Sequence, residues 1–183
     1  MEYHELNPLI RGRELELISK DTFEQMIQTD SIDSLGEILQ STIYQPYIYD
    51  GFDKDFEANL SQERSKLFQW LKESAPEPEI VWIYTMRYTF HNLKVLTKAE
   101  ITGQNLDHLY IHDGFYSLEV LKDAIHTQVS VELPDSLMDY IREVHEYCEE
   151  STILQGIDVI YDRCFLTEQR RLGEQLGYPE LLE

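Results

Sequence analysis

The residues best suited to metal chemistry lie in one short run, residues 107–113. His108 and His112 are four residues apart, and Asp107 and Asp113 flank them. Imidazole nitrogens and carboxylate oxygens are the ligands that hold zinc or manganese in hydrolases. The run lacks the glutamate of the HExxH motif and ends at an Asp-Gly turn, so we interpret both histidines as solvated loop residues. A small metal-dependent hydrolase stays open as an alternative function, and no metal ligand is assigned.

Other chemistry has no motif in this sequence. Loops that hold nucleotide phosphates place several glycines in a short stretch, and neither GxxxxGK nor GxGxxG occurs among the eight glycines. The GxSxG motif of a serine nucleophile is also missing. Paired acids such as Glu14 and Glu16 arise by chance among 35 Asp and Glu residues, and we interpret them as solvated surface. We therefore expect no catalytic residue, no cofactor and no enzyme activity.

The charge balance excludes whole classes of partner. Lys and Arg number 15 against 35 Asp and Glu, which gives a formal net charge of −20. Nucleic-acid binding needs clustered basic residues, whereas the densest clusters here are pairs, so we expect no nucleic-acid partner. The longest run without charge, residues 38–49, is too short and too polar to span a bilayer. The N-terminus lacks the pattern of a signal peptide, which favours a cytoplasmic protein with Cys148 and Cys164 as reduced, partly buried thiols.

Composition and hydrophobic spacing predict an all-α fold. The chain is 42% apolar and 27% charged, with only eight glycines and six prolines to form turns. Ser19 and Ser31 each precede an amphipathic stretch, as residues that cap helices do. Residues 44–51 and 104–114 are interpreted as connections. The predicted helices begin at Ser19 and Ser31 and then cover residues 54–73, 80–98, 118–125, 137–149 and 153–172.

The helix over residues 80–98 has a strand as its alternative. Alternate apolar residues from Ile80 to Phe90 are typical of a strand. However, no turn signal interrupts residues 78–103, and that length suits a helix better than a strand. We therefore predict a helix that is buried on most sides.

Four basic or imidazole residues share one face of this helix, namely Arg87, His91, Lys94 and Lys98. We favour their pairing with carboxylates of a neighbouring helix, because buried charges are normally paired. Binding of an acidic partner helix is the alternative. Lys94→Ala separates the two roles, since it lowers stability in the first and weakens a salt-sensitive complex in the second.

The chain also resembles itself at an offset of 98 residues. Residues 19–29 align with residues 117–127, where a Ser, an acid, a bulky apolar residue, Met or Ala, Ile and Thr coincide. This predicts a duplicated helical unit that begins again near residue 115. We expect residues 1–114 to form the first helical unit and residues 115–183 a second, incomplete one.

Three stretches carry a resemblance to a known family. Residues 7–12 (Asn-Pro-Leu-Ile-Arg-Gly, with Arg11) precede Leu-Ile-Ser, residues 33–39 run into Thr-Ile-Tyr, and Ala-Pro-Glu-Pro-Glu at 75–79 precedes Arg-Tyr-Thr-Phe-His-Asn-Leu-Lys at 87–94. In order and spacing they resemble the AC39 family, the C subunit of V-type and A-type ATPases (the d subunit in eukaryotes).

Some positions depart from the family pattern. Thr89 stands where the family often has Asp, Gln45 where a Gly follows the Tyr, and Leu9 where Arg is frequent. An ion pair built on that Asp has no counterpart in this sequence. Family members are nearly twice as long and hold three related helical units, so the chain resembles an N-terminal portion of such a protein.

The resemblance implies a non-catalytic central-stalk (rotor) subunit of an ion-translocating ATPase. In such a funnel-like helical assembly, the subunit joins the central axle subunits to the membrane proteolipid ring and transmits torque without contacting nucleotide. A cytoplasmic position is implied, peripheral to the membrane within a membrane-bound complex. Arg11, Arg87, His91, Asn92 and Lys94 match the family motifs, with a structural or a partner-facing role. A generic acidic helical adaptor is the alternative function.

Overall fold

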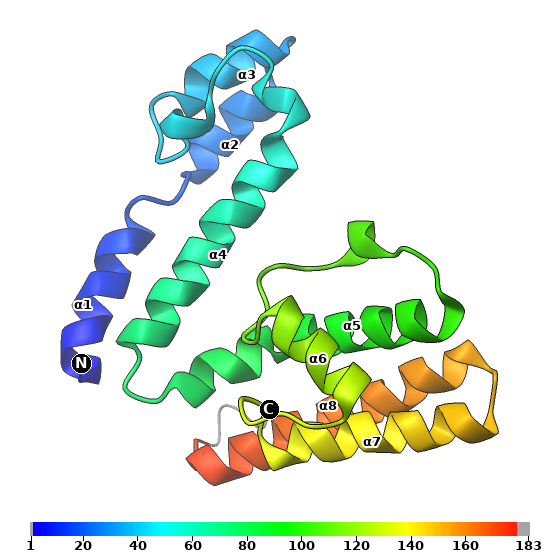
Figure 1. Ribbon diagram of the computed structural model, residues 1–183. Coiled ribbons are helices and arrows are strands. Elements are labelled where there is room, and N and C mark those ends of the chain that lie inside the picture. Colours follow the sequence, from blue (N-terminus) through cyan, green and yellow to red (C-terminus); the bar gives the residue numbers. More distant parts are fainter. Residues whose placement is uncertain (1, 179–183) are drawn as a thin grey trace. The chain divides into compact units, whose positions relative to one another are not determined.

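The protein consists of helices throughout the residues that the structure describes. A computed structural model describes residues 2–178, which contain eight α-helices and three 3-10 helices and no β-strand (Figure 1). The predicted all-α fold is confirmed. The elements are α1 (Tyr3–Glu14), α2 (Lys20–Ile27), α3 (Ile32–Leu39), η1 (Gln45–Tyr47), η2 (Phe52–Lys54), α4 (Phe56–Ser74), α5 (Pro78–Thr102), η3 (Asp107–Leu109), α6 (Leu118–Thr127), α7 (Asp135–Glu150) and α8 (Leu154–Leu176).

The chain divides into two compact units, Met1–Pro78 and Glu79–Glu183. The boundary falls at the proline-containing turn between α4 and α5, where prolines end one helix and begin the next. This division reflects packing, whereas the predicted units 1–114 and 115–183 concern duplicated sequence. The repeat therefore stays a prediction. The offset of 98 does recur in two helix starts, because α6 begins 98 residues after α2 and α8 begins 98 residues after α4.

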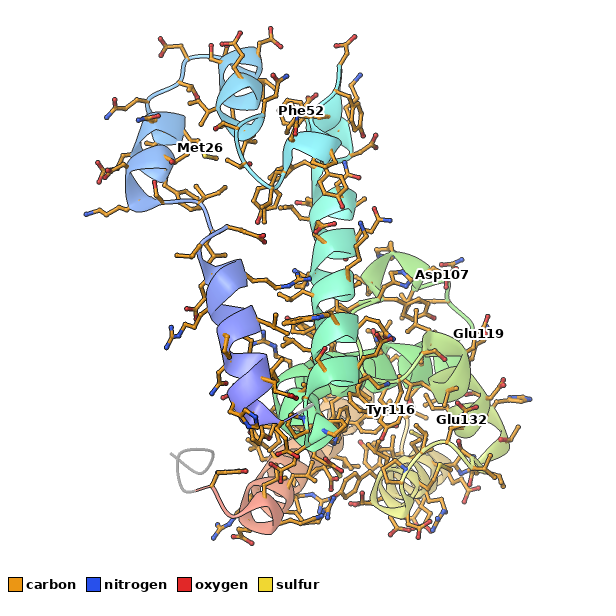
Figure 2. All side chains as sticks on the ribbon, turned by 90° about the vertical axis from the view of Figure 1, so that its left-hand side faces the viewer. Met26, Phe52, Asp107, Tyr116, Glu119 and Glu132 are labelled. Atoms are coloured by element: carbon orange, nitrogen blue, oxygen red, sulfur yellow. The ribbon has the colours of Figure 1, made fainter. Side chains whose placement is uncertain are left out.

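The first unit has a small core. Ser19 and Ser31 cap α2 and α3 as predicted, because each hydroxyl accepts a hydrogen bond of 3.1 Å from the backbone N–H three residues later. Phe52 packs against α3 at Gly36, where a Cβ atom would lie 3.1 Å from the phenyl ring (Figure 2). Among the described residues of this unit, the buried apolar side chains are Leu6, Leu39 and Phe52.

Polar contacts connect α1 to the C-terminal part of α4 and to the turn that follows it. The Tyr3 hydroxyl donates a hydrogen bond of 2.7 Å to the Glu77 carboxylate. The Arg13 guanidinium lies 4.3 Å from the centre of the Trp70 ring, a cation–π contact. These contacts fix α1 against α4, although Leu6 is the only residue of α1 that is buried.

The second unit is built around α5. The predicted helix over residues 80–98 is confirmed, and it extends over 25 residues from Pro78 to Thr102. No helix within residues 2–178 is apolar over a length that would cross a membrane. The residues that α5 buries cover most of its circumference: Val81, Trp82, Ile83, Thr85, Met86, Thr89, Phe90, Asn92, Leu93, Val95, Leu96 and Thr97. Strand-like alternation is thus the outcome of a helix that packs on most sides.

Helices α7 and α8 form an antiparallel pair that covers α5, and a glycine permits their close approach (Figure 1). The Tyr147 hydroxyl donates to the Ile153 carbonyl at 2.9 Å and accepts from Ser151 at 3.0 Å. The ring then lies so close to Gly156 that a Cβ atom there would overlap it. Only glycine leaves room for Tyr147 in this position.

We expect Gly156→Ala to lower the free energy of unfolding by about 1–3 kcal/mol, because the added methyl group overlaps the Tyr147 ring. Urea unfolding followed by circular dichroism measures this change. In a Tyr147→Ala background, the same substitution should raise stability by about 0.5–1 kcal/mol, because alanine favours helix over glycine. A loss of equal size in both backgrounds would contradict the contact.

Candidate functional site

The basic stripe of α5, which consists of Arg87, His91, Lys94 and Lys98, contacts several different segments. Lys98 pairs with both carboxylate oxygens of Asp158 on α8, at 2.6 and 2.8 Å. Lys94 pairs with Asp162, one turn further along α8. Pairing with carboxylates of a neighbouring helix is the arrangement that we favoured from the sequence, and these two lysines make it.

The other two members of the stripe make different contacts. The His91 Nε2 atom lies 2.9 Å from the Leu109 carbonyl oxygen in the connection before α6. Arg87 is exposed and contacts its own helix. Its guanidinium donates to the Tyr88 hydroxyl at 2.9 Å and lies over the Tyr88 ring. The structure therefore uses three of the four residues to bring other segments onto α5.

Asn92 fastens the same connection from within the core. Its amide nitrogen donates to the Ile111 carbonyl at 2.7 Å, and its oxygen accepts from the Ile111 N–H at 2.9 Å. Asn92 is fully buried, so it satisfies two backbone groups that would otherwise be desolvated without a partner. The family motif residue thus has a structural contact that explains its residue type.

Thr89, where the family often has Asp, faces the end of this connection. A Cβ atom on Gly114 would lie 3.5 Å from the Thr89 hydroxyl and 3.2 Å from the Tyr116 carbonyl oxygen. The Thr89 hydroxyl is buried and has no hydrogen-bond partner among the described residues. A threonine carries no charge, so it cannot form the ion pair that an Asp at this position could form.

Arg11 belongs to α1, in the first unit. Its guanidinium pairs with Glu14 at 2.6 Å, one turn later on the same helix, and its side chain is exposed. Exposed pairs of this kind contribute little to stability. The other four family-motif residues belong to the second unit, where His91, Asn92 and Lys94 contact different segments.

The histidine-containing run before α6 does not assemble a metal site. His108 and His112 are exposed, whereas Asp113 is buried. Asp107, the first residue of η3, accepts a hydrogen bond from Asn105. Within residues 2–178, no group of three His, Cys, Asp or Glu side chains is arranged to hold a metal ion. The metal-dependent hydrolase alternative gains no support from this geometry.

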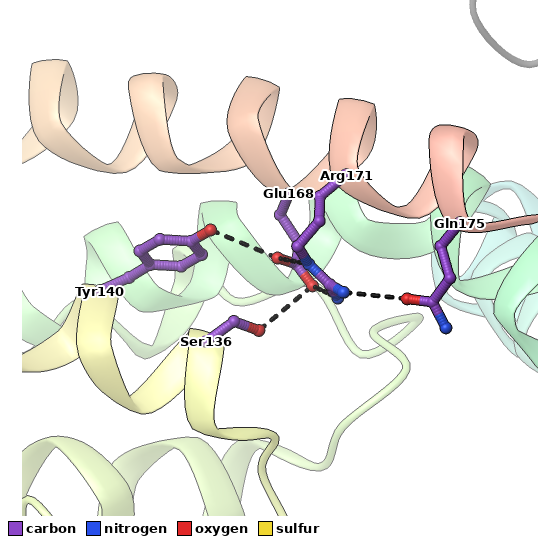
Figure 3. A network of polar contacts seen from close by, with 5 residues as sticks. All are labelled: Ser136, Tyr140, Glu168, Arg171 and Gln175. Atoms are coloured by element: carbon purple, nitrogen blue, oxygen red, sulfur yellow. Dashed lines mark hydrogen bonds and ion pairs between the residues drawn. The ribbon is translucent and has the colours of Figure 1, made fainter.

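A buried carboxylate on α8 is the polar centre that the sequence analysis missed. Glu168 is fully buried and receives two hydrogen bonds from Arg171, at 2.7 and 3.0 Å (Figure 3). From α7, the hydroxyls of Ser136 and Tyr140 donate to its two oxygens, each at 3.3 Å. Arg171 also donates to Gln175 at 3.0 Å. Both oxygens of the carboxylate are thus directed at α7 or at the next turn of α8.

This network changes the acidity of its members. Burial and the negative charge of Glu168 raise the pKa of the Tyr140 hydroxyl to about 12. The hydrogen bonds to Glu168 raise the pKa of Arg171. Both groups therefore stay protonated as donors at neutral pH. A sequence signal exists, because Glu168 falls in register with the buried stripe Ile157, Tyr161, Cys164 and Leu172.

A pocket of about 240 Å³ opens between the end of α5 and α7. Its lining combines isoleucine side chains and the Cys148 thiol with Glu100, His145 and Glu149. Tyr161 and Thr97, which also line it, share a hydrogen bond of 3.1 Å. Cys148 is half-buried and Cys164 is buried, and both are free thiols. Burial raises the pKa of the Cys164 thiol to about 11, so this sulfur is an unreactive core group.

Arg171→Ala should lower the free energy of unfolding by about 2 kcal/mol, because it leaves the Glu168 carboxylate buried without its cation. Arg170→Ala is the matched control, since Arg170 makes only an exposed pair with Glu174 on the same helix. Its effect should stay within about 0.5 kcal/mol. Equal effects of the two substitutions in urea unfolding would show that the buried network does not stabilise the unit.

Lys94→Ala and Lys98→Ala together should lower the free energy of unfolding by about 1–2 kcal/mol, because both pairs are partly shielded from solvent. Lys122→Ala, at an exposed position of α6, is the control for loss of a positive charge. Thermal unfolding at low and high salt measures the difference, and the loss should shrink at high salt. An unchanged melting temperature in the double variant would contradict the structural role of the stripe and favour binding of a partner.

Comparison with known proteins places this arrangement in a family. The sequence model of the ATP synthase (C/AC39) subunit matches residues 6–183. The C subunit of the A-type ATP synthase of Methanocaldococcus jannaschii is 22% identical over 185 residues, which cover 92% of this chain and 46% of that protein. The chain therefore spans about half the length of this relative. Because the match runs through both compact units, the protein belongs to the ATP synthase (C/AC39) subunit family.

Proposed function

We propose that this protein is a non-catalytic central-stalk (rotor) subunit of a V/A-type ion-translocating ATPase. It couples the axle subunits to the membrane proteolipid ring and transmits torque between them. The observation that carries this proposal is the family match over residues 6–183. The repeated helical units of a funnel-like assembly, its cytoplasmic position and its peripheral attachment to the membrane belong to the same proposal.

Torque transmission requires elements that do not slide past one another. Helix α5 has 25 residues and is therefore about 38 Å long. It is held to α8 at three successive levels, by Lys94 with Asp162, by Thr97 with Tyr161 and by Lys98 with Asp158. Because these contacts and the Glu168 network fix the register of three long helices, the second unit is suited to act as a rigid lever.

The charge of the chain indicates what its partners present. At −20, the protein repels acidic surfaces at long range, so the surfaces that receive it carry basic patches. Lys94, Asn92 and His91 are engaged within the second unit. We therefore assign these three a structural role. The exposed Arg11 and Arg87 suit contacts with carboxylates of a partner, outside its basic patches.

The test is assembly and coupling in the native host. The affinity-tagged chain, purified from gently solubilised membranes, should bring with it the axle subunits and the proteolipid. Deletion of its gene should leave ATP hydrolysis by the membranes measurable while ATP-driven ion uptake into vesicles falls by about tenfold or more, because the motor is no longer joined to the ring.

Restoring the gene in the deletion strain is the control, and it should recover ion uptake. Purification with unrelated proteins and without ATPase subunits would favour the generic acidic adaptor instead. Unchanged ion uptake in the deletion strain would overturn the coupling role.

A further inference from the structure

An apolar face of α2 is left open to solvent in the first unit. Phe23 is 50% exposed and Ile27 is 80% exposed. Met26, which is labelled in Figure 2, lies between them in the sequence and is half-buried. None of the residues of α2 is buried. These three side chains lie on one side of the helix, and we call them the α2 face.

The corresponding face of α6 is fully covered. At the offset of 98 residues, Phe23, Met26 and Ile27 align with Leu121, Ala124 and Ile125. The α6 residues are only 0%, 0% and 7% exposed, and all three belong to the core of the second unit. Both helices begin at a serine cap and have strongly one-sided apolar patterns. Equivalent positions are therefore buried in one unit and exposed in the other.

The helices that follow α2 and α6 differ in length and in the core that they complete. In the second unit α6 is followed by α7, which has 16 residues and buries the stripe Leu137, Ile141 and Val144. In the first unit α2 is followed by α3, which has eight residues and ends at Leu39. Helix α3 contacts α2 and is as long as α2, yet Phe23 and Ile27 stay exposed beside it. Among the described residues of the first unit, the α2 face has no counterpart to the α5, α7 and α8 side chains that complete the core around α6.

We propose that the α2 face binds an amphipathic helix of a protein partner, with an aliphatic stripe and basic flanks. The aliphatic stripe takes the place of the α7 stripe. Basic flanks follow from charge, because residues 20–39 carry five carboxylates and one lysine. This inference does not rest on the proposed function, since it uses only the two units of this chain.

The same charge disfavours other occupants. A second copy of the chain brings a further −20 of net charge to the face. An anionic membrane surface attracts basic segments and repels this acidic one. A basic helix gains from both the apolar contact and the surrounding carboxylates.

Synthetic helical peptides of about five turns test the proposal with the whole chain. One peptide combines a leucine stripe with lysine, and the second keeps the stripe and replaces every lysine by glutamate. By calorimetry, the lysine peptide should bind with micromolar affinity that weakens with salt, and the glutamate peptide should not bind measurably. Phe23→Ser with Ile27→Ser should weaken binding by about tenfold or more, because two apolar contacts are lost.

Gln25→Ser with Gln28→Ser is the matched control on the opposite side of α2, and it should leave the affinity unchanged. Melting temperature should be unchanged in the control and should fall by only a few degrees in the Phe23 and Ile27 variant, because Ile27 is 80% exposed and half of Phe23 is already covered in the free chain. A fall of about 10 °C or more in that variant would show that the chain itself covers the face, and this would overturn the proposal.

Four further results would also overturn it. Equal binding of the two peptides would show that the face does not select basic flanks. Equal binding of the lysine peptide to both double variants would show that it binds outside the α2 face. A dimer in sedimentation equilibrium that dissociates in the Phe23 and Ile27 variant would make a second copy the occupant. Flotation of the chain with phosphatidylcholine and phosphatidylglycerol vesicles, lost in the same variant, would make a membrane the occupant.

Discussion

Burial of α5 is the constraint on which the second unit depends. A helix that packs on most sides exposes few of its polar groups to water, so these groups need partners within the protein, and among the described residues Thr89 is the exception. The Thr85 hydroxyl donates a hydrogen bond of 2.9 Å to the Val81 carbonyl of its own helix. Asn92 and Thr97 instead reach Ile111 and Tyr161, and each contact fixes another segment against α5. The polar groups of one buried helix thereby position the connection before α6 and the whole of α8.

The buried carboxylate of Glu168 fixes α7 and α8 against each other. A buried carboxylate is costly, and it is tolerated here because four donor contacts from Ser136, Tyr140 and Arg171 surround Glu168. Ser136 and Tyr140 lie one turn apart on α7. A shift of α8 along α7 by one turn would separate the carboxylate from at least one of them. The network therefore specifies register, which apolar packing by itself specifies less strictly.

The two units differ in how much of their apolar surface they bury. The second unit has a continuous core across α5 to α8, while the described part of the first buries three apolar side chains and leaves the α2 face open. A unit with so small a core gains much of its stability from whatever binds it. Such a division suits a protein whose family works as part of a larger complex, because one unit is rigid by itself and the other has surface left for neighbours.

The sequence by itself determined the helical class, the two serine caps, the excess of acidic residues and the family motifs, because these depend on spacing and composition along the chain. Periodicity also predicted α5 correctly once length was weighed against alternation. Only the tertiary structure decided that Lys94 and Lys98 meet Asp162 and Asp158, which lie 68 and 60 residues away. It also decided the unit boundary at Pro78 and the burial of Glu168. Spacing shows which residues share a face of a helix, whereas the partner of that face depends on how distant segments pack in space.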